Sequence, residues 1–232
     1  MSFANYGLDP AWFQNAPGLA YCAALKITKV SLELISASNM YLMIENGIRG
    51  GISMISKIYS NANNKYLVGY DKSKGRIFIV DLKLPVASFK WICDDELNNW
   101  ENIPCFLEVD LECPESLHNY QNCYPLAPER KTVGKVQKLL PNLDNKTNYV
   151  IHHKVLKNYI QKGLVVKNIH RGIKFREEAW LKHYIKLKTQ LRTAGKTNFE
   201  KDFFKLMNNN VCGKMMENVR NRVDDEKVEH LG

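Results

Sequence analysis

The sequence lacks several features that would assign it to a specialised class of protein. None of its six cysteines forms a Cys-x-x-Cys pair, so the spacing of a structural zinc site is missing. The best apolar run, around Ile77–Leu84, is broken by Asp81 and Lys83 and is too short to span a bilayer. No leader sequence, internal repeat or low-complexity tract is visible. We therefore expect an intracellular protein, nuclear or cytoplasmic, with reduced thiols and no membrane partner.

The composition is that of a globular protein with a basic surface. The 232 residues suffice for one or two domains, and a content of 45% hydrophobic and 25% charged residues is ordinary. The net charge of +9 favours an anionic partner such as nucleic acid, and aromatic residues interleaved with lysine and arginine suit stacking on single strands. Many basic proteins bind neither nucleic acid nor membranes, so charge alone does not decide the function.

The most informative segment is 201–222, KDFFKLMNNNVCGKMMENVRNR, which a helical wheel divides into two faces. The face predicted to dock on a core holds Phe199, Phe203 and Leu206. The opposite face presents ammonium groups and amides at one-turn spacing and holds Lys201, Lys205, Asn208 and Cys212, with Asn209 at its edge. Stacked lysines suit a polyphosphate, whose charge needs point cations. A solvated amphipathic helix is the alternative interpretation.

The stretch KLMNNNVCGK at 205–214 resembles the fingers motif Lys-x3-Asn-Ser-x-Tyr-Gly of family B DNA polymerases. Asn210 stands where the family has serine, and Cys212 stands where it has an aromatic residue. The resemblance runs through nearly all of the chain. It is most specific in Met40–Lys65, which is similar to the protein-primed branch found in Maverick/Polinton-type transposons and related viral or plasmid elements.

The resemblance implies an α+β chain with an incomplete family B polymerase fold. Residues 1–29 would close the exonuclease-like region, and residues 30–112 would form a partial palm sheet with an Arg-Gly-Gly template loop. Residues 113–148 would be an insertion or connector, residues 149–222 helical-hairpin fingers and residues 223–232 a flexible tail.

The resemblance also implies the roles of individual residues. Lys205 would be the catalytic lysine that steadies the triphosphate of an incoming dNTP. The nucleotide-binding residues would be Lys201, Lys205, Asn209, Gly213 and Arg192. Arg49, Gly50 and Gly51 would hold the single-stranded DNA template. The implied partners are DNA template and primer, dNTP and a terminal (priming) protein.

Asp81 is the candidate metal ligand, at the end of a strand predicted over Arg76–Leu82. A palm presents its first Mg²⁺-binding aspartate in this way, and two-metal phosphoryl transfer needs a second carboxylate. The family segment that carries the sugar-screening tyrosine is absent after Asp81. Asp81 is therefore either the retained catalytic aspartate or a loop residue at a deletion. The 232 residues contain no Asp-Thr-Asp motif for the second metal position.

Other polar groups have plainer interpretations. Phe106–Glu112 alternates as a half-buried strand does, so its carboxylates are expected on an exposed face rather than at a metal. Asp9 is expected to cap a helix rather than to complete an exonuclease site. We reject His152-His153 as a metal pair, because adjacent residues of a helix diverge by about 100° and no third ligand is suitably spaced.

Local patterns complete the prediction. Arg130–Asn148 is expected as a basic loop, Asn148–Gly163 as a helix and Leu164–Phe175 as a strand or hairpin. Glu177–Arg192 is expected as a helix with an apolar stripe of Trp180, Tyr184, Leu187 and Leu191, and with Lys182, Lys186 and Lys188 largely off it.

Three functional hypotheses follow. The first is a DNA-directed DNA polymerase family member, acting in DNA replication by nucleotidyl transfer, present as a fragment that is inactive alone. The second is a non-catalytic nucleic-acid-binding remnant of a transposon or viral polymerase, using Arg49, the loop of Lys131–Lys146 and the lysine faces of the fingers. The third is a product without function, because part of the palm floor is missing.

Overall fold

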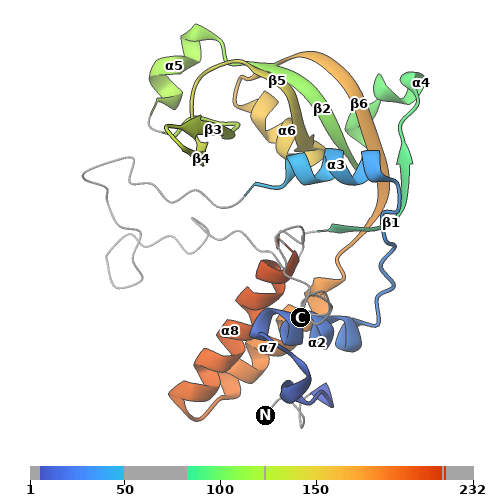
Figure 1. Ribbon diagram of the computed structural model, residues 1–232, viewed down its shortest axis with the longest axis vertical. Coiled ribbons are helices and arrows are strands. Elements are labelled where there is room, and N and C mark those ends of the chain that lie inside the picture. Colours follow the sequence, from blue (N-terminus) through green and yellow to red (C-terminus); the bar gives the residue numbers. More distant parts are fainter. Residues whose placement is uncertain (1–5, 50–82, 123, 216, 218–232) are drawn as a thin grey trace, which may run out of the picture. The chain divides into compact units, whose positions relative to one another are not determined.

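The computed structural model describes residues 6–49, 83–122, 124–215 and 217. They form an α+β fold that divides into two compact units (Figure 1). The sheet unit is Leu32–Glu178, and the helical unit combines Met1–Ser31 with Ala179–Gly232. The strand predicted over Arg76–Leu82 lies outside the described residues, as does its Asp81.

The sheet unit is built on four antiparallel strands in the order β1-β6-β2-β5. Their bounds are β1 Leu84–Trp91, β2 Cys105–Glu112, β5 Lys146–His152 and β6 Val165–Glu178. The 14-residue β6 pairs with β2 along its first part and with β1 along its last part. The sheet curls along its length, as Figure 1 shows.

Alternation along β2 sets the two faces of the sheet. Its buried residues are Cys105, Leu107, Val109 and Leu111, which confirms the predicted half-buried strand. Helix α6 (His153–Gln161) covers this face with Leu156. On the other face Met43 of α3 (Ser38–Gly47) packs against Val150 and Ile173. Each such side chain contributes about 1.5–3 kcal/mol when fully buried.

The helical unit contains α2 (Ala16–Thr28), α7 (Leu181–Ala194) and α8 (Asn198–Met215). Three fully buried alanines of α2 let its neighbours approach closely, and they are Ala20, Ala23 and Ala24. Helices α7 and α8 form the predicted antiparallel hairpin. A capping box starts α8, because Glu200 N–H donates to Thr197 Oγ1 and Thr197 N–H donates to the Glu200 carboxylate, both at 3.2 Å.

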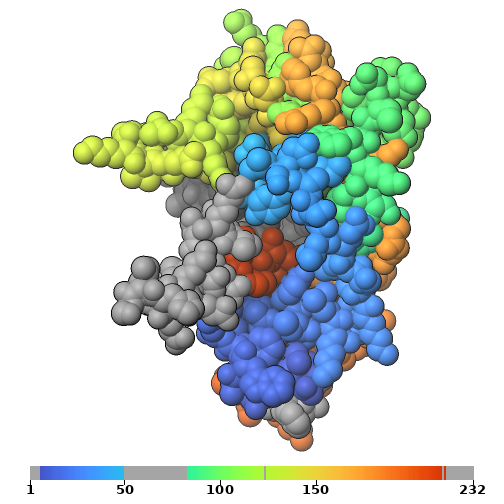
Figure 2. Space-filling model, turned by 45° about the vertical axis from the view of Figure 1, so that its right-hand side comes forward, coloured from blue at the N-terminus to red at the C-terminus, as the bar shows by residue number. Residues whose placement is uncertain are grey.

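A β-hairpin replaces the basic loop predicted over Arg130–Asn148. Strands β3 (Glu129–Val133) and β4 (Val136–Leu140) pair in continuous register up to Val133 and Val136. The two-residue turn begins with Gly134, whose φ of 65° is the left-handed conformation that such turns require. Figure 2 shows this hairpin standing out from the rest of the sheet unit.

Two other boundaries differ from the prediction. The segment predicted as a helix over Asn148–Gly163 begins as strand β5, because Tyr149, Val150 and Ile151 suit a sheet, and becomes helical only at His153. The segment predicted as a helix from Glu177 remains in β6 to Glu178, paired with β1, and α7 begins at Leu181. Tertiary pairing therefore overrides the helical periodicity.

The short elements agree with their capping signals. Asp9 Oδ1 accepts a 2.9 Å hydrogen bond from Ala11 N–H and caps η1 (Pro10–Trp12), as expected. The remaining short helices are α4 (Asp94–Leu97), η3 (Trp100–Asn102) and α5 (Glu115–Gln121). Among the described residues, no helix has both the length and the apolar character needed to cross a membrane.

Gly172 lies opposite Leu107 where β6 meets β2. A Cβ at this position would lie 2.8 Å from Ile92 Cδ1 and 2.8 Å from Leu107 Cδ2. We predict that Gly172→Ala lowers the free energy of unfolding by about 1–3 kcal/mol, because the core must move to admit it. Urea denaturation measures the change. Gly213→Ala is the control, since nothing lies within 4 Å of its Cβ position. An unchanged midpoint for Gly172→Ala would contradict the described packing.

Candidate functional site

The predicted nucleotide-binding residues of α8 lie along one exposed line. Lys201, Lys205, Asn209 and Gly213 are all exposed and follow one another at one-turn spacing. Neither lysine has an acidic partner within the described part of the chain. The line therefore offers two unneutralised ammonium groups, one amide and one position without a side chain.

The apolar face predicted for α8 is wrong. Its buried residues are Phe204, Met207 and Val211, whereas Phe199 is 70% exposed and Leu206 is 50% exposed. On the helical wheel, the line of Lys201 and Lys205 therefore lies between the buried residues and the exposed residues Phe199 and Leu206. Because Phe203 and Phe204 are adjacent, the sequence allows either of two sides of α8 to face the core. Packing against α2 and α7 buries Phe204. Lys201 and Lys205 are exposed as predicted, but Asn208 and Cys212, predicted on the same face, are half-buried.

Arg192 lies in the last turn of α7 and is exposed, as its predicted phosphate contact requires. The hairpin turn that follows it leads directly into the capping box of α8. Arg192 and Lys201 therefore belong to the same end of the α7–α8 hairpin.

The Arg49 side chain is bound by residues of the sheet unit. Its Nη1 donates to Val150 O at 2.7 Å and to Gly47 O at 3.2 Å. The guanidinium carbon lies 3.8 Å from the centre of the Tyr149 ring, a cation–π contact. Burial lowers the pKa of Arg49 from its ordinary value. These contacts fix the end of α3 immediately before Gly50 and Gly51, which lie outside the described residues.

Lys188 of α7 does not lie where the sequence predicts. It is not off the buried stripe of α7 but fully buried, at 0% exposure. Its Nζ lies 3.6 Å from the centre of the Tyr6 ring and 4.9 Å from that of Tyr184, and has no hydrogen-bond partner among the described residues. Burial lowers the pKa of Lys188 to about 8. Its spacing of four residues from Tyr184 was the available signal.

The carboxylates on the acidic face of β2 are all paired with basic side chains. Each carboxylate meets a basic side chain of β6, in the pairs Glu108–Arg171, Asp110–His170 and Glu112–Lys167. Hydrogen bonds from the His170 side chain, the Asn148 backbone and the Asn168 side chain lower the pKa of Asp110 to about 2. These cross-strand pairs hold β2 and β6 in register.

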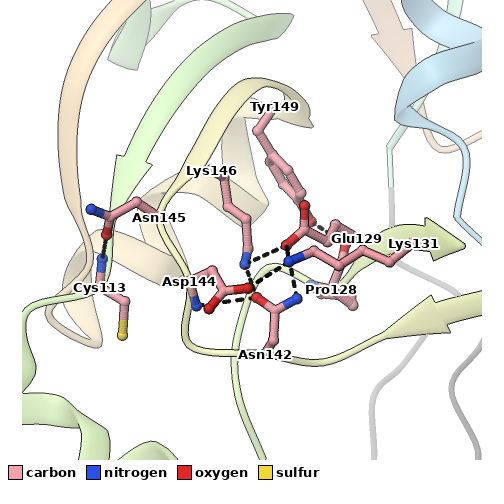
Figure 3. A network of polar contacts seen from close by, with 9 residues as sticks. All are labelled: Cys113, Pro128, Glu129, Lys131, Asn142, Asp144, Asn145, Lys146 and Tyr149. Atoms are coloured by element: carbon pink, nitrogen blue, oxygen red, sulfur yellow. Dashed lines mark hydrogen bonds and ion pairs between the residues drawn. The ribbon is translucent and has the colours of Figure 1, made fainter. Parts of the chain in front are cut away.

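A polar network closes the base of the β3–β4 hairpin (Figure 3). Lys146 is buried, with 4% exposure, and its Nζ donates to Glu129 Oε1 at 2.9 Å and to Asn142 Oδ1. Lys131 donates to Asp144 Oδ2 at 2.5 Å. Lys131 and Lys146 are therefore neutralised, while Lys135 and Lys138 remain exposed without an acidic partner in the described part of the chain.

No protein-family model matches the chain, and no curated protein sequence matches it either. The chain is similar to Phi29 DNA polymerase in an orthorhombic crystal form, with a TM-score of 0.58 and 15% sequence identity over 93% of this chain and 38% of that chain. The fold is that of part of a DNA polymerase.

Two complexes of Phi29 DNA polymerase show the same similarity. The complex with single-stranded DNA has a TM-score of 0.56 and 15% identity over 93% of this chain and 37% of that chain. The complex with primer-template DNA and incoming nucleotide substrates has a TM-score of 0.54 and 14% identity over 91% of this chain and 37% of that chain. The chain thus spans less than half the length of these polymerases, and the predicted partial polymerase fold is confirmed.

We predict that Lys188→Met raises the free energy of unfolding at about pH 7 by about 2 kcal/mol, the desolvation cost less the lost cation–π attraction. The pKa of Lys188 falls from 10.5 to about 8 on folding. Below pH 8 the folded state therefore carries the full cost of a buried charge. Between pH 8 and 10.5 the folded state loses the proton first, so the parent protein gains stability and the advantage of methionine shrinks.

Urea denaturation at about pH 7 and about pH 10 measures this difference. Lys186→Met is the matched control, because Lys186 is exposed on the same helix and should show no comparable change with pH. A Lys188→Met protein that is less stable than the parent at about pH 7 would show that the aromatic contacts outweigh the desolvation of the ammonium group.

Proposed function

We propose that the chain is part of a DNA-directed DNA polymerase of protein-primed family B, of the kind carried by Maverick/Polinton-type transposons and related elements. The observation that carries the proposal is the exposed line of Lys205, Asn209 and Gly213 on a helical hairpin within a polymerase fold. The partners are template and primer DNA, dNTP and a terminal protein. Solved Phi29 DNA polymerase complexes contain primer-template DNA and incoming nucleotides, which supports the first two.

Lys205 binds the triphosphate of the incoming nucleotide in this proposal. Its ammonium group is a compact point charge with three donors, and no carboxylate of the described residues competes for it. Lys201, one turn earlier, and Arg192 add positive charge for the same anion. A cation placed on the phosphates stabilises the charge that develops when the nucleotidyl group is transferred.

Asn209 and Gly213 continue the line toward the C-terminal end of α8. The Asn209 amide can both donate and accept a hydrogen bond, which suits the edge of a base pair. Gly213 leaves open space where a side chain would stand, so a flat base can approach the helix. Along α8 the exposed line therefore begins with positively charged side chains and ends with an open surface that can admit a base.

Arg49 acts as a positioning residue for the template loop. Its bonds to Gly47 O and Val150 O and its stacking on Tyr149 fix where the chain leaves α3. Gly50 and Gly51 would then contact the template strand through their backbone. The non-catalytic remnant is not favoured. Arg49, Lys131 and Lys146, three of its proposed binding groups, are already paired within the protein, which leaves it the exposed lysines of β4, the hairpin turn and α8.

Magnesium enters the proposal through Asp81, which the resemblance makes the first palm ligand. Bound Mg²⁺ would supply charge stabilisation for the phosphates. The 232 residues hold no Asp-Thr-Asp motif, so they provide at most one of the two carboxylate motifs that a two-metal centre needs. We therefore propose that these 232 residues bind nucleotide and DNA but do not by themselves complete the catalytic centre.

Lys205→Ala should weaken dNTP binding by about 10-fold or more, because a hydrogen bond to a charged group contributes roughly 1.5–3 kcal/mol. Titration of a fluorescent dNTP analogue into the purified chain measures the loss. Lys186→Ala removes an equally exposed lysine from α7 and should leave the affinity unchanged. Lys205→Ala binding as tightly as the parent would contradict the assignment of the triphosphate site.

Primer extension tests the proposal that these 232 residues do not by themselves complete the catalytic centre. The purified chain, given a primed template, dNTPs and Mg²⁺, should add no nucleotide, because the second carboxylate motif is not in its sequence. Extension that disappears in the Lys205→Ala protein would show that these residues do form a complete catalytic centre.

A further inference from the structure

Two histidines and a glutamate meet at the junction of β5 and α6. His152 ends β5 and caps α6, and His153 is the first residue of that helix. The chain changes from extended to helical between them, so their rings do not diverge as they would within one helix, and the ring centres lie 4.6 Å apart. Glu177 approaches from β6, at the place where β6 runs past the start of β2.

The geometry overturns the reason for rejecting this pair from the sequence. One ligand atom from each of His152, His153 and Glu177 lies within 4.8 Å of the other two. A tetrahedral zinc ion with bonds of about 2.0–2.1 Å holds its ligand atoms about 3.3 Å apart. The ligand atoms would therefore have to approach one another by about 1.5 Å at most. The third ligand, Glu177, was not evident from the sequence because it follows His153 by 24 residues and reaches the site through β6.

Burial gives independent support. His153 is 6% exposed, and neither of its ring nitrogens has a hydrogen-bond partner among the described residues. A buried polar group left in this state is costly unless something binds it. The Glu177 side chain is only 10% exposed. The His152 ring packs against Phe106 and Phe175, at centre distances of 5.4 and 5.8 Å, which gives the cluster an apolar wall.

Lys154 bonds to two of these three side chains. Its Nζ donates to both oxygens of Glu177 at 2.8 Å, and its backbone N–H donates to His152 Nδ1 at 3.2 Å. A metal bound to Glu177 would displace the Lys154 ammonium group. A metal bound to His152 would also break the bond from Lys154 N–H to Nδ1, because Nδ1 would then either bind the metal or carry the proton of the neutral imidazole. The Lys154 side chain is 41% exposed and can turn into solvent. The ammonium group is thus a competitor for Glu177.

We propose that His152, His153 and Glu177 bind a divalent transition-metal ion, with zinc preferred and water as the fourth ligand. Two imidazoles and one carboxylate are a donor set that zinc uses in proteins, whereas magnesium prefers oxygen ligands. The site shares no residue with the proposed Mg²⁺ ligand Asp81. A bound ion would tie the end of β6 to the start of α6 and so stabilise the sheet unit.

Zinc titration of the full chain, stripped with a chelator, tests the proposal by calorimetry. The parent should bind one zinc ion per chain, and His153→Gln and Glu177→Gln should each bind at least about 10-fold more weakly. Lys154→Met should bind more tightly, because Glu177 is released. His170→Gln is the control, because His170 lies on the same strand with its own partner, Asp110, and its affinity should equal that of the parent.

Cobalt(II) provides a second readout, because thiolate ligands give a charge-transfer absorption that nitrogen and oxygen ligands do not. The cobalt spectrum of the parent should show a tetrahedral complex without that absorption. Zinc should also raise the melting temperature of the parent but not of His153→Gln. Unchanged zinc affinity in both ligand variants, or a thiolate absorption that accounts for the bound cobalt, would overturn the proposal.

Discussion

The sheet unit depends on hydrogen bonding along one strand, β6. It is the shared neighbour of β1 and β2, so its 14 residues carry the ladder for both sides of the sheet. Gly172 lies in its middle, where Leu107 and Ile92 occupy the space of a side chain. The acidic face of β2 and the basic residues of β6 then fix the register by charge. Backbone pairing, core packing and cross-strand charge all act through this strand.

Two buried lysines show different solutions to one electrostatic problem. The Lys146 ammonium group is surrounded by oxygen atoms of Glu129 and Asn142, which compensate its charge. Lys188 has only aromatic rings around it, and the pKa of its ammonium group is lowered by burial. The first lysine belongs to a network that orders the hairpin base, whereas the second makes the folded state more stable as the pH rises from about 8 to 10.5.

Much of the architecture was predictable from local signals. The alternation of 106–112, the Asp9 cap and the exposure of Lys201 and Lys205 on α8 depend on neighbouring residues in the sequence, and the structure agrees with them. The hairpin at Gly134 and the strand from Lys146 were missed, because their pairing partners, rather than their composition, decide their conformation. The buried face of α8 was misread, since adjacent apolar residues fit two docking directions. The cluster around His153 needed long-range contact, which one sequence does not reveal.

The length of the β3–β4 hairpin and the stability of the sheet unit depend on different residues. Its register is regular from Glu129 paired with Leu140 to Val133 paired with Val136, and its side chains beyond the base are exposed. Its base is tied to the rest of the sheet unit, through Glu129 and Lys146 and through Arg130, whose Nη2 donates to Ile48 O at 3.1 Å. Adding equal numbers of residues to both strands would therefore lengthen the projection without disturbing the core. Evolution can adjust how far this arm extends independently of how firmly the domain folds.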